Sequence, residues 1–306
     1  KGWIPISDDA VTDAPVAPAT QKAIFGYGNT GSVTAVSNLV SSSGVVASDV
    51  SGVGTARKIL AAATYGGDKG IFGYGTTASS TDYVSLTNLV NNSGVIAADV
   101  TGVGTARRDL AAAKYGTDKA IFGYGYSGSD VSLTNLVNNV GVVASDVSGV
   151  GTARHGLAAT TYGTDKAIFG YGETSGVVSL TNLVNNSGVV AADVTGVGTA
   201  RTVPAAAGYG TDKALFGYGD GYTAVTNLVS NVGVVATDVS GVGTARGSLA
   251  AAAYGGDKAI FAYGYNGSGY LSMSNLVSNS GVVATDVSGV GTDRSVLAAA
   301  GYSQSA

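Results

Sequence analysis

The sequence predicts an all-β fold, a six-bladed β-propeller of four-stranded antiparallel blades, and three observations predict it. A unit of 45–50 residues recurs along the chain, each unit holds four short apolar segments, and the two chain ends carry complementary pieces of one unit. Four short strands at this spacing are typical of propellers. Glycine supplies 48 of the 306 residues and charged residues only 12 %, which favours closely packed strands and tight turns over helices.

An arginine marks each unit. Successive arginines are 50, 47, 47, 45 and 48 residues apart, and each lies 19 residues after the asparagine of an (S/T)-N-L-V motif. The first five also lie 18 residues before the last glycine of the next F-(G/A)-Y-G motif. All length variation therefore falls in the loop between Y-G and S/T-N-L-V. The arginines are Arg57, Arg107, Arg154, Arg201, Arg246 and Arg294.

Four strands are expected in each unit, as the unit from residue 110 to 147 illustrates. The first is L-A-A-A-x-Y (Leu110 to Tyr115), and a glycine-led G-T-D turn suited to a tight hairpin follows it. The second is K-A-I-F-G-Y-G (Lys119 to Gly125), which the variable loop separates from the third, V-S-L-T-N-L-V (Val131 to Val137). The fourth is V-V-A-S-D-V (Val142 to Val147), after which G-V-G-T-A-R leads to the next unit.

The two ends of the chain predict ring closure. The first motif begins at a second strand, Lys22–Gly28, and the chain finishes with a first strand, Leu297–Tyr302. Pairing these strands removes two exposed sheet edges at once. We therefore expect residues 22–306 to form one six-bladed propeller. Residues 1–21 match no repeat, and we expect them to form an N-terminal extension that tethers or docks the ring.

With these motifs, the chain resembles the kelch-like propellers. An arginine precedes a small-residue strand, and a short hairpin and an apolar strand ending on glycines follow, from Lys22 to Tyr302. The double glycine of kelch motifs is replaced by G-Y-G, and the tryptophan usual in the fourth strand is missing. The repeats look similar to those of kelch-like proteins of tailed phages and aquatic bacteria. The resemblance implies closure by a C-terminal first strand and a virion or extracellular setting.

Composition argues against several classes of function. A net charge of −4 argues against nucleic-acid binding, and no apolar run reaches the roughly 18–20 residues of a membrane span. Cysteine is absent and His155 is the sole histidine, so we expect no metal, no cofactor and no catalytic triad. We place His155 at a surface position. Glu173 is the sole glutamate, and no singular pair of carboxylates indicates a glycosidase. We therefore expect a protein that is not an enzyme.

An aspartate in the fourth strand recurs with each arginine. Groups used identically in every blade are what stacked neighbours require, so we interpret the pairs as structural ion pairs between blades. The alternative is a ring of ligand-binding charges, as in a multivalent lectin that binds carbohydrate at equivalent sites between blades. The aspartates are Asp49, Asp99, Asp146, Asp193, Asp238 and Asp286.

Two variable sets of residues fall on the same predicted face of the ring. They are the loops between second and third strands and the residues just after the arginines. Tyrosine beside Gly, Ser, Asn and Asp is a mixture typical of binding surfaces, although unconstrained loops would also diverge. We expect a non-catalytic recognition or structural module on a larger extracellular or virion-like assembly, with other protein subunits or surface glycans as partners. A polysaccharide-active enzyme is a further alternative. The candidate binding residues are Tyr83, Tyr126, Asp130, Glu173, Asp220, Tyr222, Tyr265 and Tyr270.

Overall fold

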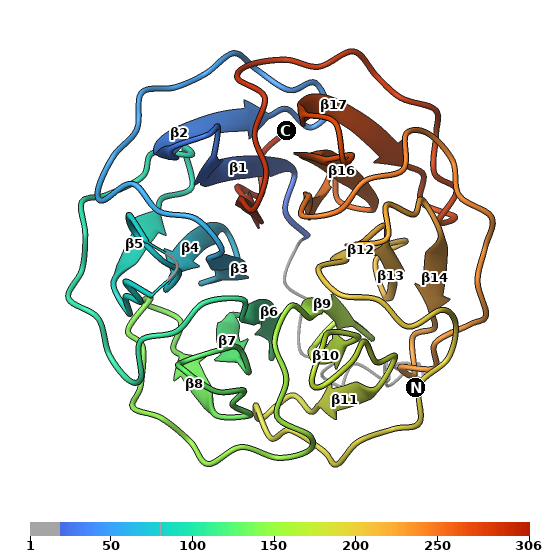
Figure 1. Ribbon diagram of the computed structural model, residues 1–306. Helices are drawn as coiled ribbons and strands as arrows, with labels where there is room; N and C mark the ends of the chain where they lie inside the picture. Colours follow the sequence, from blue (N-terminus) through green and yellow to red (C-terminus); the bar gives the residue numbers. More distant parts are fainter. Residues whose placement is uncertain (1–18, 80) are drawn as a thin grey trace, which may run out of the picture.

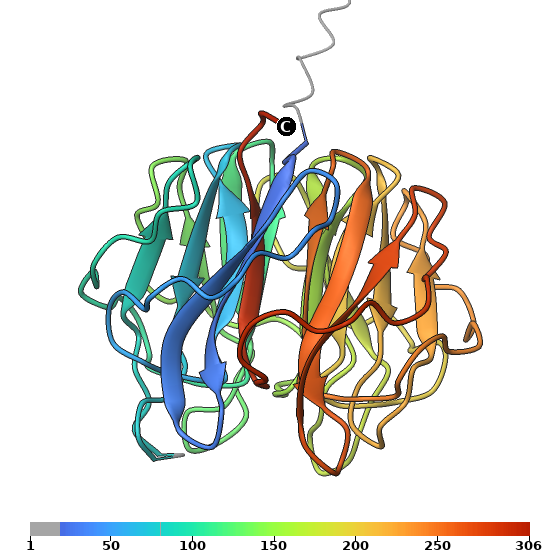
Figure 2. The ribbon, with the colours of Figure 1, turned by 90° about the horizontal axis from the view of Figure 1, so that it is seen from above.

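The computed structural model describes residues 19–79 and 81–306, so most of the expected N-terminal extension lies outside the described residues. The described chain forms six three-stranded antiparallel sheets and contains no helix. Figure 1 shows the sheets arranged around a central axis, in the manner of a β-propeller. In the side view of Figure 2 the strands run between the two ends of this arrangement, and the C-terminus lies at one end.

Each sheet has an inner, a middle and an outer strand, which correspond to the first three predicted strands. The inner strands are β18 (Ala298–Tyr302), β3 (Ala61–Tyr65), β6 (Ala111–Tyr115), β9 (Ala158–Tyr162), β12 (Ala205–Tyr209) and β15 (Ala250–Tyr254). The middle strands are β1 (Lys22–Asn29), β4 (Lys69–Gly73), β7 (Lys119–Gly123), β10 (Lys166–Gly170), β13 (Lys213–Gly217) and β16 (Lys258–Tyr265). The outer strands are β2 (Val33–Val40), β5 (Thr87–Val90), β8 (Thr134–Val137), β11 (Thr181–Val184), β14 (Thr226–Val229) and β17 (Tyr270–Val277).

The predicted pairing of the two chain ends is present. β1 pairs antiparallel with β18, with Lys22 opposite Tyr302, in the register by which Lys69 lies opposite Tyr65 in the next sheet. The inner strands contact one another in the cyclic order β18, β3, β6, β9, β12, β15 and back to β18. The strand from the C-terminal end therefore completes the sheet that begins at the N-terminal end.

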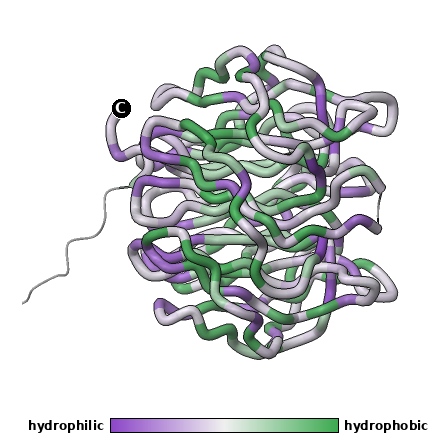
Figure 3. The backbone as a smooth tube through the Cα atoms, turned by 90° about the vertical axis from the view of Figure 1, so that its left-hand side faces the viewer, coloured by the Kyte–Doolittle hydropathy of each residue, from purple (hydrophilic) through white to green (hydrophobic). Residues whose placement is uncertain are grey.

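The predicted fourth strand is wrong in its detail, because the segment makes two isolated bridges and no continuous strand. In one sheet these bridges join Val137 to Val143 and Thr134 to Val147, so the register shifts by one residue between them. The Asn135 side chain fills the break by donating from Nδ2 to the Ala144 carbonyl, 3.0 Å away. The segment also lies at the outer rim, where its first valine is about 60 % exposed, as at Val142. Polar and apolar residues are interspersed along the backbone tube (Figure 3).

Aromatic rings join neighbouring sheets. The tyrosine of each G-Y-G motif has a positive φ, as at Tyr74 (65°), and where the strand continues past it the register shifts at this point. The resulting bulge turns the ring onto the phenylalanine of the next sheet, and Tyr74 and Phe122 lie 5.1 Å apart in an edge-to-face contact. Glycine precedes the tyrosine because a Cβ on Gly73 would lie 2.8 Å from the Phe122 ring. Ala262 replaces this glycine once, and the corresponding rings, Phe25 and Tyr263, are 5.4 Å apart.

Candidate functional site

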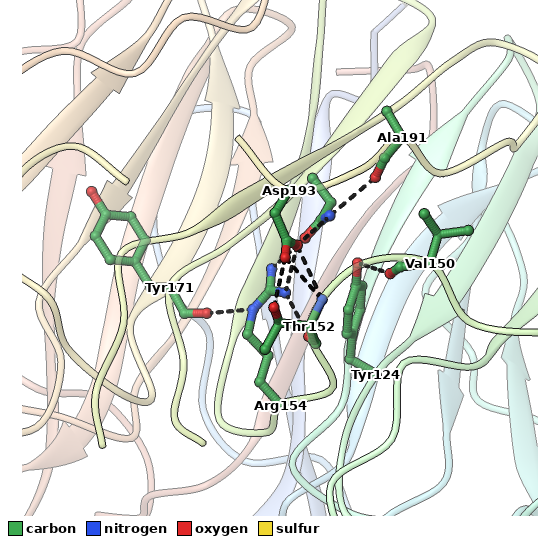
Figure 4. A network of polar contacts seen from close by, with 8 residues as sticks. Tyr124, Val150, Thr152, Arg154, Tyr171, Ala191 and Asp193 are labelled. Carbon is green, nitrogen blue, oxygen red and sulfur yellow. Dashed lines mark hydrogen bonds and ion pairs between the residues drawn. The ribbon is translucent and has the colours of Figure 1, made fainter. Parts of the chain in front are cut away.

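The six repeated arginines are buried between sheets, and Arg154 shows their geometry (Figure 4). Its Nε donates to the Tyr171 carbonyl at 2.9 Å, Nη1 to the Thr152 carbonyl at 3.1 Å, and Nη2 to Asn182 Oδ1 at 2.8 Å. The guanidinium carbon lies 4.5 Å from the ring centre of Tyr124 in the preceding sheet. Each arginine therefore joins two sheets through three hydrogen bonds and a cation–π contact.

The aspartates do not pair with the arginines as the sequence interpretation expected. The Asp193 carboxylate accepts bonds from the Thr152 backbone and hydroxyl and from Asn182 Nδ2 at 2.9 Å. Among the described residues one arginine and one aspartate of this set come within ion-pair distance, Arg154 and Asp193 at 3.9 Å. The asparagine of the S/T-N-L-V motif connects the two charges instead. Burial opposes ionisation of Asp193, but hydrogen bonds from Thr152 and Asn182 outweigh it and hold the pKa of the carboxyl below its ordinary value.

These repeated groups are a poor choice for ligand contacts. The arginines are at most 2 % exposed and the motif asparagines are fully buried, and both kinds of side chain already bond within the protein. The same contacts join the last sheet to the first, because Arg294 donates to the Tyr27 carbonyl at 3.0 Å and to Asn38 at 2.6 Å. The networks at Arg57, Arg107, Arg154, Arg201, Arg246 and Arg294 therefore hold the sheets together.

The diverse residues lie in a ring of their own, which we call the variable ring. It combines the residue after each arginine with the residue after each G-Y-G motif, and backbone hydrogen bonds of 2.8–3.0 Å join the two in every sheet. The six positions after the arginines hold six different residue types. A constant backbone therefore presents changing side chains. The pairs are Lys58 and Thr76, Arg108 and Tyr126, His155 and Glu173, Thr202 and Asp220, Gly247 and Tyr265, and Ser295 and Asn29.

Charged side chains gather in one half of the variable ring. His155 Nδ1 donates to Asp130 Oδ1 at 2.7 Å, and the His155 ring lies 5.6 Å from the ring of Tyr126. The Arg108 guanidinium lies over the same Tyr126 ring, 5.1 Å from its centre. Arg108 Nη1 also donates to Asp109 Oδ2 at 2.7 Å. The buried Nε of Arg108 has no hydrogen-bond partner among the described residues. This half therefore offers donors, acceptors and an aromatic ring within one cluster.

Tyrosines gather in the other half. Tyr265 lies 6.0 Å from Tyr222 and 5.6 Å from Tyr270, measured between ring centres, and the Tyr270 hydroxyl accepts a 2.8 Å bond from Asn29. Tyr222 is 42 % exposed. Between the two halves lies Asp220, whose carboxyl pKa is raised by burial and by the nearby charge of Glu173. Aromatic rings beside amide and carboxylate groups make this half suited to stacking and hydrogen bonding with a ligand.

Six residues with positive φ lie inside the variable ring at the axis. Five backbone hydrogen bonds of 2.6–3.2 Å connect them from sheet to sheet, and Ile59 (57°) and Val203 (44°) adopt this conformation despite branching at Cβ. A cavity of about 100 Å³ with both polar and apolar walls lies beside them. Burial raises the pKa of the Asp109 carboxyl there, and Arg108 and His155 only partly offset the effect. The six residues are Ile59, Asp109, Gly156, Val203, Ser248 and Val296.

The structure brings together most of the predicted binding residues but in two groups. Tyr83, Tyr126 and Asp130 belong to the charged half, where Tyr83 and Tyr126 have ring centres 6.3 Å apart. Tyr222, Tyr265 and Tyr270 form the aromatic half, with Glu173 and Asp220 in the bridged pairs between. Sequence reasoning missed the roles of Arg108, Asp109 and His155. Their place directly after repeated arginines was the available signal, since every such position differs between units.

His155 is the one histidine of the chain, and its surroundings fix its orientation. The bond to Asp130 orients the His155 imidazole, and no described serine or threonine hydroxyl bonds to it. Among the described residues no three His, Cys, Asp or Glu side chains are grouped to hold a metal ion.

The described residues also include no helix of the length and hydrophobicity needed to cross a membrane. A search with protein-family models found no match, and no curated protein matched the chain.

Proposed function

We propose that the chain is a recognition module that binds its ligand through the variable ring and the loops around it. The observation that carries this proposal is the contrast between the two sets of six. Arginine networks repeat with the same partners in every sheet, whereas backbone-bridged pairs at the axis differ in every sheet. Diverse side chains on a rigid, repeated scaffold are the arrangement that binding surfaces use.

The ligand class that best fits this surface is a glycan. The aromatic half provides three neighbouring tyrosine rings with Asn29 beside them, and sugar rings stack on such faces. The charged half provides the partly exposed side chains of His155, Asp130 and Arg108, which suit hydroxyl groups that both donate and accept. The alternative lectin, with equivalent sites between sheets, is less favoured because its arginines and asparagines are buried and bonded.

The finer fold and setting belong to the same proposal. A closed six-bladed propeller is supported by the pairing of β1 with β18 and by the Arg294 network between the last and first sheets. Membership of the kelch-like proteins and display on an extracellular or virion-like assembly are supported by the sequence resemblance. A role without catalysis is supported by the His155–Asp130 pair, which contacts no nucleophilic hydroxyl among the described residues.

A glycan array tests the proposal directly. The full chain is compared with a variant in which four tyrosines of the variable face, Tyr83, Tyr126, Tyr222 and Tyr265, are replaced by serine. A matched control replaces four exposed asparagines of the opposite end by alanine (Asn92, Asn186, Asn231 and Asn279), each of which bonds an aspartate of the inner hairpin turn.

We expect the full chain and the asparagine control to bind the same glycans, and the tyrosine variant to lose at least tenfold in affinity. Binding that survives in the tyrosine variant contradicts recognition through the variable face. Absence of glycan binding by a folded full chain contradicts the ligand class, and docking to a larger particle is then measured with the same variants.

A further inference from the structure

A second axial cavity lies at the opposite end from the variable ring. It measures about 160 Å³ and is lined by the ends of the inner strands and by the turns that follow them. Six equivalent positions, each just before the last tyrosine of an inner strand, surround it. They hold Thr64, Lys114, Thr161, Gly208, Ala253 and Gly301. One of the six is therefore charged, and the rest are small.

The small residues make room for the lysine. Six strands converge at the axis, and three of the equivalent positions have only a methyl group or a hydrogen as side chain. Lys114 is partly buried among alanines of the inner strands, including Ala63 and Ala113. A flexible lysine stem packs well against such walls.

No other group of the described residues neutralises this ammonium by direct contact. The aspartates in the surrounding turns each lie 3.4–3.9 Å from the lysine that follows them, as Asp118 does from Lys119 at 3.5 Å. Among residues 19–79 and 81–306, Lys114 Nζ makes no hydrogen bond or ion pair. Burial lowers the pKa of the Lys114 ammonium and the charge of Asp118 only partly opposes it. A half-desolvated charge without a partner is costly, and an anion would remove that cost.

The two threonines at positions equivalent to Lys114 do not supply further donors. The Thr64 hydroxyl donates to the Gly301 carbonyl at 2.8 Å, and the Thr161 hydroxyl donates to the Lys114 carbonyl at 2.9 Å. Their protons are therefore occupied. A single ammonium attracts an anion by its charge, whereas a pair of fixed donors also selects for the shape of the anion. The cavity volume has room for a small ion together with several waters.

We propose that this axial cavity binds one small oxyanion, a carboxylate or inorganic phosphate, against the Lys114 ammonium. Binding selects for charge, so affinity increases from acetate to phosphate. The site is independent of the variable ring, since the two lie at opposite ends of the axis.

The experiment titrates the full chain with inorganic phosphate and, separately, with acetate at low ionic strength, and follows amide and lysine side-chain signals by NMR. The test variant is Lys114→Thr, which places at this position the residue that Thr64 and Thr161 already show to be compatible with the fold. The matched control is Lys119→Thr, which removes the same charge from a lysine whose side chain is 48 % exposed in the adjacent turn.

We expect saturable shifts confined to inner strands around the cavity in the full chain, with one phosphate bound. We expect at least a tenfold loss of affinity in Lys114→Thr and less than a twofold change in Lys119→Thr. No saturable binding by the full chain, or an equal loss in both variants, overturns the proposal. Shifts at the outer turns rather than at the cavity overturn it as well, because they mark general surface attraction.

Discussion

The asparagine of the S/T-N-L-V motif is the residue on which each arginine network depends, and replacing one tests this directly. Asn182→Leu keeps the number and branching of the side-chain heavy atoms but removes the acceptor 2.8 Å from the buried Arg154 Nη2 and the donor to Asp193. A buried donor without a partner costs about 1–3 kcal/mol, and more when it is charged. Asp193 lies nearer the surface and keeps its hydrogen bonds from Thr152. Its lost bond from Asn182 therefore adds little to the loss of stability. We expect the free energy of unfolding to fall by about 3 kcal/mol.

Urea denaturation followed by circular dichroism measures the change, with a second probe to check for a single transition, since repeat proteins often depart from two-state unfolding. The control is Asn186→Leu, which removes an exposed amide that bonds Asp165 at 3.1 Å and should change stability by no more than about 0.5 kcal/mol. A loss below about 1 kcal/mol for Asn182→Leu would refute the view that the asparagine connects the two charges.

Three further predictions concern the same scaffold. The six aspartates of the fourth segments have pKa values below the ordinary one, since their hydrogen bonds outweigh the effect of burial. Their contribution to stability is present above about pH 4 and is lost as the pH falls through the folded-state pKa values. The urea midpoint should therefore drop on acidification, and a midpoint that stays constant from pH 6 to 3 would exclude this. Gly104→Ala should lower the free energy of unfolding by about 3 kcal/mol, because φ is 76° there and a Cβ would collide with the aspartate–asparagine pair. Gly128→Ala, where φ is 103° but no atom lies near the Cβ position, should lower it by about 1 kcal/mol. Equal losses would show that backbone strain alone matters. A circular permutant can join Tyr302 to Lys22 through Gly-Thr-Asp and open the chain at residues 116–118. It should fold and melt within a few degrees of the original chain, because the strand pairs at both places have the same register. A permutant that fails to fold contradicts ring closure through β1 and β18.

The regular part of the fold could be predicted from the sequence because the repeat holds its spacing where contacts are made. The constant 18 residues from arginine to the glycine of the next Y-G reflect such a contact, since Arg107 Nε donates to the carbonyl of Tyr124, the residue before that glycine. The pairing of Lys22 with Tyr302 followed from the incomplete units at the chain ends. These features depend on period and pattern, which a single sequence displays.

The rest depended on side-chain geometry that period does not reveal. The fourth strand was expected from the repeated V-V-A-S-D-V segment, but the Asn135 side chain takes the place of backbone hydrogen bonds there. The contact of His155 with Asp130 joins residues 25 positions apart across a loop of variable length, so no constant spacing marked it. Lys114 carried a visible signal, as the one charged residue at its position in six units, but its significance depends on the cavity it lines.

The central claim is that recognition takes place on the variable ring and not between the sheets or at the opposite end. A crystal structure of the chain with the best ligand from the glycan array tests it most directly. The account predicts ligand density over the axis at the variable ring, in contact with at least one of Tyr265 and Tyr126 and with Asp220 or His155 nearby. Ligand density between sheets, against the arginine networks, or at the end that carries the Lys114 cavity would contradict it.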